Sequence, residues 1–209
     1  MLEKTAFGLE RNDEEPNIAL AEELCRDRNL AGIAEIAAGL DSKKPRLAND
    51  CIKVLYEIGA RNPELIADDT EKFLSLLRSP NNRLVWGGMT ALTYVTHLRP
   101  QIVFSSLELV LEALEHGSVI TKDNAVSVLA ELARTNFHYA ETVFPILLSH
   151  LAACRPKEIP QHAERISVCI GRENLSPFVD LLESRKADLS PAQAKRMDRI
   201  FEKLRKKLQ

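Results

Sequence analysis

The stretch RLVWGGMTALTYVTHLRPQI, residues 83–102, decides the fold because the chain repeats its pattern on either side. The segment RLANDCIKVLYEIGARNPEL (46–65) lies 37 residues earlier, and TKDNAVSVLAELARTNFHYA (121–140) continues the same period. Leu55, Leu92 and Leu129 therefore fall in one row, each at the end of an apolar cluster with helical spacing. A fixed period of this length predicts a repeat architecture.

A second apolar segment follows in each repeat and keeps the same offset, with Leu74, Leu111 and Leu148 in register. Turn-forming Asn, Pro, Gly and Ser residues separate the segments, so each repeat reads as a helical hairpin. The first helices are predicted at 46–60, 83–98 and 121–135, and the second at 69–79, 105–116 and 142–153. Asp69, Ser105 and either Thr142 or Glu141 are the predicted starts of the second helices.

The pattern becomes irregular towards both ends, as terminal repeats of an array usually do. Gly171 is expected to end one helix, Ser176-Pro177 to begin the next, and Ser190–Gln193 to form a capping box. We predict one domain over 1–209: an N-terminal segment (1–16), an atypical hairpin (17–44), three regular repeats (45–158), a shortened repeat (159–190) and a basic capping helix (191–209).

Two glycines, Gly87 and Gly88, directly follow the only tryptophan of the chain, Trp86. Gly88 aligns with Cys51 and Ala125, so a small residue there is expected to let neighbouring helices approach closely. Gly87 is placed on the outer side of its helix, where no packing reason for it is apparent. Trp86 is predicted to point away from its own hairpin, and either packs on a neighbouring hairpin or anchors a partner.

These three stretches resemble HEAT/armadillo-type repeats, and the resemblance covers about residues 17–190. It implies an all-α fold, a right-handed α-α superhelix of about four to five hairpins. It also implies a curved scaffold whose second helices line a concave, partner-binding surface. Most proteins of this type are binding or assembly modules, and a minority act on damaged DNA bases. The sequence departs from the usual pattern in lacking a regular proline in the first helix and a regular Asp/Arg ladder.

Composition narrows the function classes further. The 28 basic and 30 acidic residues give a net charge of −2, which argues against a general nucleic-acid binder. No signal pattern or apolar run of about 20 residues is present, so we expect a soluble, cytoplasmic protein.

Enzyme motifs are also missing, since the sequence contains no GxSxG, P-loop or GxGxxG. No CxxC pair and no HxxxH or HExxH spacing occurs, so the sequence predicts no metal site and no cofactor. We therefore expect a non-catalytic protein.

The candidate partner-binding residues lie around the middle repeat. Glu108, Glu112 and Glu115 fall on one face of a predicted helix, either to receive a basic peptide or as a solvated face neutralised by Lys72 and Arg78. The helix entrances carry Arg46, Arg83 and Lys122, which with Asn81, Asn82 and Trp86 could form a ridge that binds an anion or a carboxylate.

The last helix is the alternative interface. Its outer face carries seven basic residues against Asp198 and Glu202, a balance of 7 − 2 = +5. The basic residues are Lys195, Arg196, Arg199, Lys203, Arg205, Lys206 and Lys207. The face is either that of a plain capping helix or a contact for nucleic acid or an anionic membrane.

We expect a scaffold that binds another protein or peptide. The alternative is a nucleic-acid-associated solenoid, such as a divergent DNA-repair relative, that uses the hairpin corners and the last helix.

Overall fold

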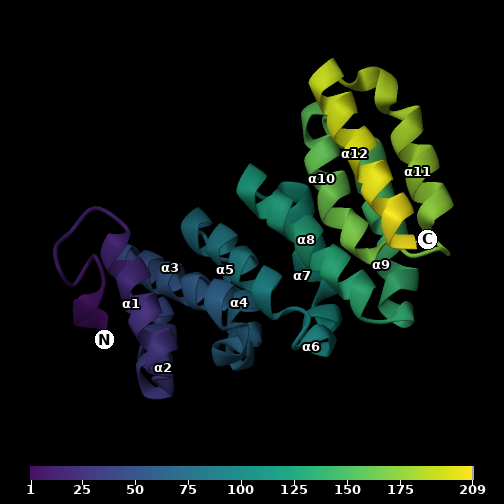
Figure 1. Cartoon of the computed structure of the whole chain (residues 1–209). Helices are drawn as coiled ribbons and strands as arrows, with labels where there is room; N and C mark the ends of the chain where they lie inside the picture. The colour runs from purple at the N-terminus through teal and green to yellow at the C-terminus, as the bar shows by residue number, and fades with distance from the viewer. Residues whose placement is uncertain (209) are drawn as a thin grey trace. The chain divides into compact units, whose positions relative to one another are not determined.

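Helices account for all the regular secondary structure in residues 1–208, which are the residues that the computed structural model describes (Figure 1). The all-α prediction is therefore confirmed. The α-helices are α1 (Glu15–Arg26), α2 (Leu30–Ala38), α3 (Pro45–Arg61), α4 (Thr70–Leu76), α5 (Asn82–Val95), α6 (Pro100–Ser105), α7 (Leu107–His116), α8 (Val119–Thr135), α9 (Phe137–Ala153), α10 (Ile159–Ile166), α11 (Leu175–Ser184) and α12 (Pro191–Leu208).

The apolar rows that defined the repeat form the core. Leu55, Leu92 and Leu129 are fully buried, and so are the residues one turn further along each first helix, Ile58, Val95 and Leu132. In the second helices the fully buried row is Phe73, Val110 and Leu147, one residue before the row used to predict the repeat. Of that predicted row Leu74 is buried, whereas Leu111 and Leu148 are half-buried. A helix with one buried stripe cannot bury it alone, so each hairpin is stabilised by its neighbours.

The second helices differ from prediction at their starts. The middle one is split into α6 and α7, so Ser105 ends a helix instead of beginning one. The third begins at Phe137, five residues before Thr142, because the Asn136 side chain accepts a 3.0 Å hydrogen bond from the Tyr139 amide. Asp69 does stand before α4, but its side chain makes no capping bond.

The chain forms two compact units, one of residues Met1–Ala125 and a second from Val126 onward. In the first unit α3 packs between α1 and α5, and α4 packs on α5. The glycine pair lies at these contacts. A Cβ atom on Gly88 would lie 3.0 Å from the Phe73 carbonyl oxygen of α4, so the predicted close approach is confirmed.

Gly87 is a correction to the sequence prediction. It is buried, and a Cβ atom there would lie 2.7 Å from Ile52 Cγ1 of α3. The two glycines therefore let α5 contact α4 on one side and α3 on the other.

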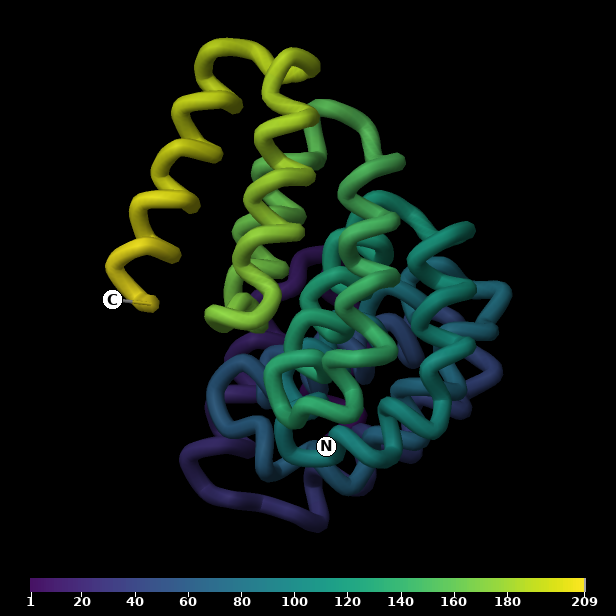
Figure 2. The backbone as a smooth tube through the Cα atoms, turned by 90° about the vertical axis from the view of Figure 1, so that its right-hand side faces the viewer, coloured from purple at the N-terminus to yellow at the C-terminus, as the bar shows by residue number. Residues whose placement is uncertain are grey.

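In the second unit α10 lies against α12 and α9, and α9 also packs on α11 (Figure 2). The predicted capping box is present at the start of α12, where the Ser190 amide donates to Gln193 Oε1 at 2.9 Å. Two other expectations are wrong. The helix before Gly171 already ends at Ile166, and α11 begins at Leu175, while the Ser176 hydroxyl bonds Asp180 instead of capping.

Candidate binding surfaces

The acidic stripe on α7 is exposed as predicted. Glu108, Glu112 and Glu115 all face solvent, and within residues 1–208 neither Glu108 nor Glu112 forms an ion pair. Glu115 lies 3.7 Å from the ring of the equally exposed His116. The expected neutralisation by Lys72 does not occur, because Lys72 bonds Asp41 and the Ala37 carbonyl.

A hollow of about 320 Å³ opens beside this stripe. The turn between α4 and α5 forms one wall with Pro80 and Asn82, and the last turn of α7 forms the other with Glu112 and His116. Leu77, Val85 and Ala113 supply apolar surface inside it. The structure thus brings together two residues that the sequence had assigned to separate surfaces, Asn82 and Glu112.

A second hollow, of about 350 Å³, lies between α4 and the α6–α7 junction. Its lining includes Glu71 and Arg78 from the α4 side and Ile102 and Leu109 from α6 and α7. We call the surface formed by α4, the α4–α5 turn and α7 the α4–α7 face. It is hollowed twice and carries the carboxylates of α7.

Trp86 lies elsewhere on the first unit. Its ring is half-buried, 5.9 Å from the ring of Tyr56 on the preceding hairpin, and the Arg83 guanidinium lies 5.4 Å from its centre. The sequence left two alternatives for Trp86, packing on a neighbouring hairpin or anchoring a partner. The structure has the first of these. Aromatic and cation–π contacts of this kind favour a fixed ring.

The N-terminal segment occupies two of the three basic corners, those of Arg46 and Arg83, whereas Lys122 donates to the Glu115 carbonyl at 2.7 Å. Arg83 forms an ion pair with Glu14, which also accepts a bond from Lys53 at 3.1 Å. Burial alone would raise the pKa of Glu14, but its bonds to Arg83 and Lys53 bring that pKa below its ordinary value. Arg46 donates to the Arg11 carbonyl at 2.5 Å and to Asn12 at 2.6 Å. The predicted carboxylate ligand of this ridge is thus a residue of the chain itself.

The basic helix α12 buries Met197, Ile200, Phe201 and Leu204 and exposes its cations. Arg196 pairs with Glu164, and Lys207 donates to the Val168 and Ile170 carbonyls. Lys195, Arg199, Lys203 and Lys206 have no ion pair within the described part of the chain. The helix thus packs on the second unit through one apolar row, and its outer face stays charged.

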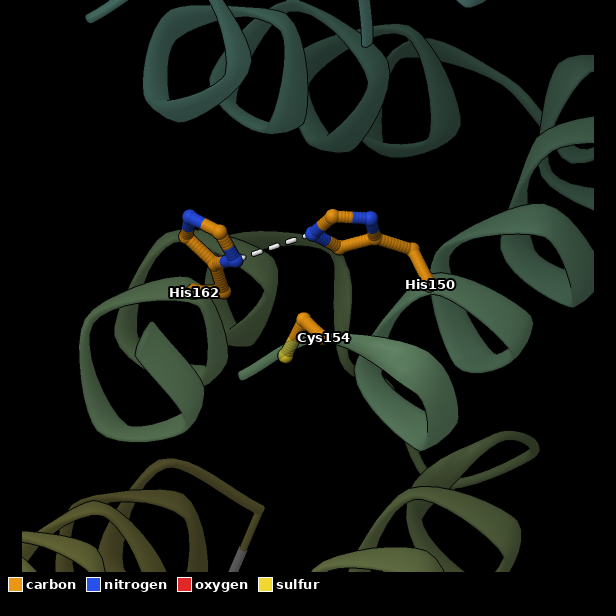
Figure 3. Close-up of side chains that lie close together, drawn as sticks. All are labelled: His150, Cys154 and His162. Atoms are coloured by element: carbon orange, nitrogen blue, oxygen red, sulfur yellow. Dashed lines mark hydrogen bonds between the residues drawn. The ribbon is translucent and has the colours of Figure 1, made fainter. Parts of the chain in front are cut away.

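One cluster was missed by the sequence reading. His150, Cys154 and His162 point towards one another in the second unit (Figure 3). The pair His150 and Cys154, four residues apart at a helix end, was an available signal. His162 lies on the next helix, and the spacing across the intervening turn matches no familiar metal motif.

No protein-family model matches the chain, and no curated protein sequence matches it significantly. Solved structures do resemble it. The karyopherin Kap121p bound to the SUMO protease Ulp1p is 17% identical with a TM-score of 0.66, over 95% of this chain and 22% of that chain. Kap121p bound to Ste12p is 18% identical with a TM-score of 0.65, over 88% and 21%. An engineered protein is 16% identical with a TM-score of 0.65, over 98% and 96%.

The chain thus spans about a fifth of the Kap121p structures. At these identities the likeness shows the fold, which is that of a HEAT-like helical repeat, as the sequence predicted. In the described residues, no helix combines the length and apolar composition that crossing a membrane requires.

Proposed function

We propose that this HEAT-like α-solenoid is a non-catalytic interaction module that binds a basic segment of a partner protein on its α4–α7 face. The observation that carries the proposal is the row of exposed carboxylates at Glu108, Glu112 and Glu115 beside the 320 Å³ hollow. The cytoplasmic location expected from the sequence remains a prediction.

The row favours a cationic ligand for an electrostatic reason. Like charges one turn apart on a helix repel each other by a few tenths of a kcal/mol per pair. Among residues 1–208 neither Glu108 nor Glu112 has an ion-pair partner, whereas Lys or Arg side chains of a partner protein would supply one. The hollow adds specificity, because an apolar or aliphatic stem entering it would meet Leu77, Val85 and Ala113.

The neighbouring structures support a protein ligand. Kap121p is seen bound to the protein Ulp1p in one structure and to Ste12p in another. Each is a case of a helical repeat of this fold in complex with a protein.

Four of the residues predicted from the sequence contact the partner directly in this proposal: Asn82, Glu108, Glu112 and Glu115. Trp86 and Arg83 have another role in it. Arg83 pairs with Glu14 of the N-terminal segment, and Trp86 packs between Arg83 and Tyr56 of α3, so both support the fold of the first unit.

Affinity capture from native lysate, with and without nuclease, tests this. Wild type is compared with a Glu108/Glu112/Glu115→Lys triple variant. A matched control variant, Glu173/Asp180/Glu183→Lys, makes the same charge change at exposed positions of the second unit. We expect a protein partner that survives nuclease, is retained by the control and is lost by the triple variant. Capture of nucleic acid alone, equal in all three proteins, would contradict the proposal and favour α12 as the interface.

A further inference from the structure

Two histidines and a cysteine come together where α9 ends and α10 begins. His150 lies in the last turn of α9, and Cys154 caps that helix, its amide bonded to the His150 carbonyl at 2.8 Å. His162 lies in the middle of α10 and is only 1% exposed. The three side chains thus come from two helices joined by a short turn.

The cluster has a compact geometry. One ligand atom from each side chain lies within 4.8 Å of the other two. His150 Nε2 and His162 Nδ1 share a hydrogen bond of 2.9 Å, and the two rings lie 4.9 Å apart between centroids (Figure 3). A tetrahedral zinc ion with Zn–N near 2.0–2.1 Å and Zn–S near 2.3 Å holds its ligand atoms roughly 3.3–3.6 Å apart. The three side chains would need to move by about one ångström to pass from the metal-free arrangement to the zinc-bound one.

The surroundings hold this turn in place. Arg185, at the end of α11, donates to the Leu151 carbonyl at 2.9 Å and to the Cys154 carbonyl at 3.1 Å. Arg155 and Glu158 close the turn, because both the Arg155 amide and its guanidinium Nε donate to the Glu158 carboxylate, at 3.2 Å and 3.0 Å. The backbone that carries Cys154 is therefore fixed before any ligand arrives, which lowers the entropic cost of binding.

We propose that His150, Cys154 and His162 form a zinc site with three protein ligands and a water molecule in the fourth position. Two imidazoles with one thiolate suit a borderline-soft ion that prefers tetrahedral geometry. In the metal-free chain, one imidazole proton lies between the two rings. When zinc binds, this proton moves to the other nitrogen of the same ring, and the thiol loses its proton to become a thiolate, so one proton is released to solvent for each zinc bound.

The site has an entry path, because His150 is partly exposed while His162 is buried. Bound zinc would join the end of α9 to the middle of α10, and it would therefore stabilise the second unit against unfolding.

Cobalt(II) is the probe for the site, used on the reduced full-length chain. We expect one equivalent to give the visible absorption of tetrahedral Co²⁺ and a thiolate-to-cobalt charge-transfer band, and one equivalent of Zn²⁺ to abolish both. X-ray absorption of the zinc form should show one sulfur at about 2.3 Å and two nitrogens at about 2.0–2.1 Å.

Two variants assign the ligands. Cys154→Ser should remove the charge-transfer band, and His150→Gln should weaken zinc binding by at least about a hundredfold. Cys169→Ser is the matched control, because Cys169 belongs to the same unit and lies outside the cluster. An octahedral cobalt spectrum, binding unchanged in Cys154→Ser, or no binding at micromolar metal would overturn the proposal. If a variant fails to fold, X-ray absorption of the zinc-bound wild-type protein tests the proposal instead. A zinc coordination shell without sulfur would contradict the proposed site.

Discussion

Gly87→Ala tests how closely α5 packs on α3. The added Cβ atom would lie 2.7 Å from Ile52 Cγ1 and 3.1 Å from Ile52 Cγ2, whereas carbon atoms in contact prefer about 3.5–4.0 Å. Ile52 is fully buried and branched at Cβ, so it cannot swing aside. The overlap must be relieved by moving the helices.

The expected change in the free energy of unfolding is the difference between two opposing contributions. Overpacking of a core costs about 1–3 kcal/mol, while alanine in place of glycine inside a helix gains about 1 kcal/mol. The variant should therefore lose about 1 kcal/mol of unfolding free energy. With a urea dependence of about 2 kcal/mol per molar, the midpoint of unfolding falls by roughly 0.5 M.

Urea unfolding followed by circular dichroism and by tryptophan fluorescence measures this change. The only tryptophan, Trp86, is next to the mutated position and reports on α5 directly. Gly171→Ala is the control, because its Cβ atom would meet only the carboxylate end of Glu173, which is exposed and can move. An unchanged or raised midpoint for Gly87→Ala would refute the packing argument.

Three further predictions concern other parts of the chain. Asn136→Ala removes the side-chain cap of α9 and should cost about 1 kcal/mol in chemical unfolding; no loss would mean that the cap is not formed in solution. Burial alone would raise the pKa of Glu57, but bonds from Lys53 and Arg61 lower it, so its stabilisation is present above the unfolded-state pKa and disappears as pH falls through the folded value. Glu57→Gln should accordingly reduce the loss of stability in urea titrations between neutral and acid pH, and an identical pH profile would contradict this. Burial raises the pKa of Cys51 to about 12, so iodoacetamide at mildly basic pH should modify it only after unfolding, and rapid modification of the native chain would show that α3 opens.

The repeat was predictable because its core rows depend on local spacing. A leucine every 37 residues within helical clusters fixes which face of each helix is buried, whatever the partners are. The start of α9 was harder to predict. Asn136 is one of the Asn residues that predict a turn between the two segments, but its side chain caps the helix and Tyr139 is buried behind it.

The features of the candidate site that the sequence could not predict mostly depend on contacts between residues far apart in the chain. The ion pair of Arg83 and Glu14 joins residues 69 apart, and only the folded chain shows that it occupies the expected carboxylate site. The hollow shared by Asn82 and Glu112 likewise depends on how the α4–α5 turn meets α7. The exposed carboxylates of α7, by contrast, followed directly from helical periodicity.

Hydrogen–deuterium exchange of the chain with and without its captured partner shows whether the partner binds the α4–α7 face, as proposed. We expect slower exchange over α7 (Leu107–His116) and the turn at 79–82, with α12 unchanged. Both effects should weaken as salt is added, because the contact is between charges. Protection confined to α12, or protection of α7 that persists in the Glu108/Glu112/Glu115→Lys variant, would contradict it.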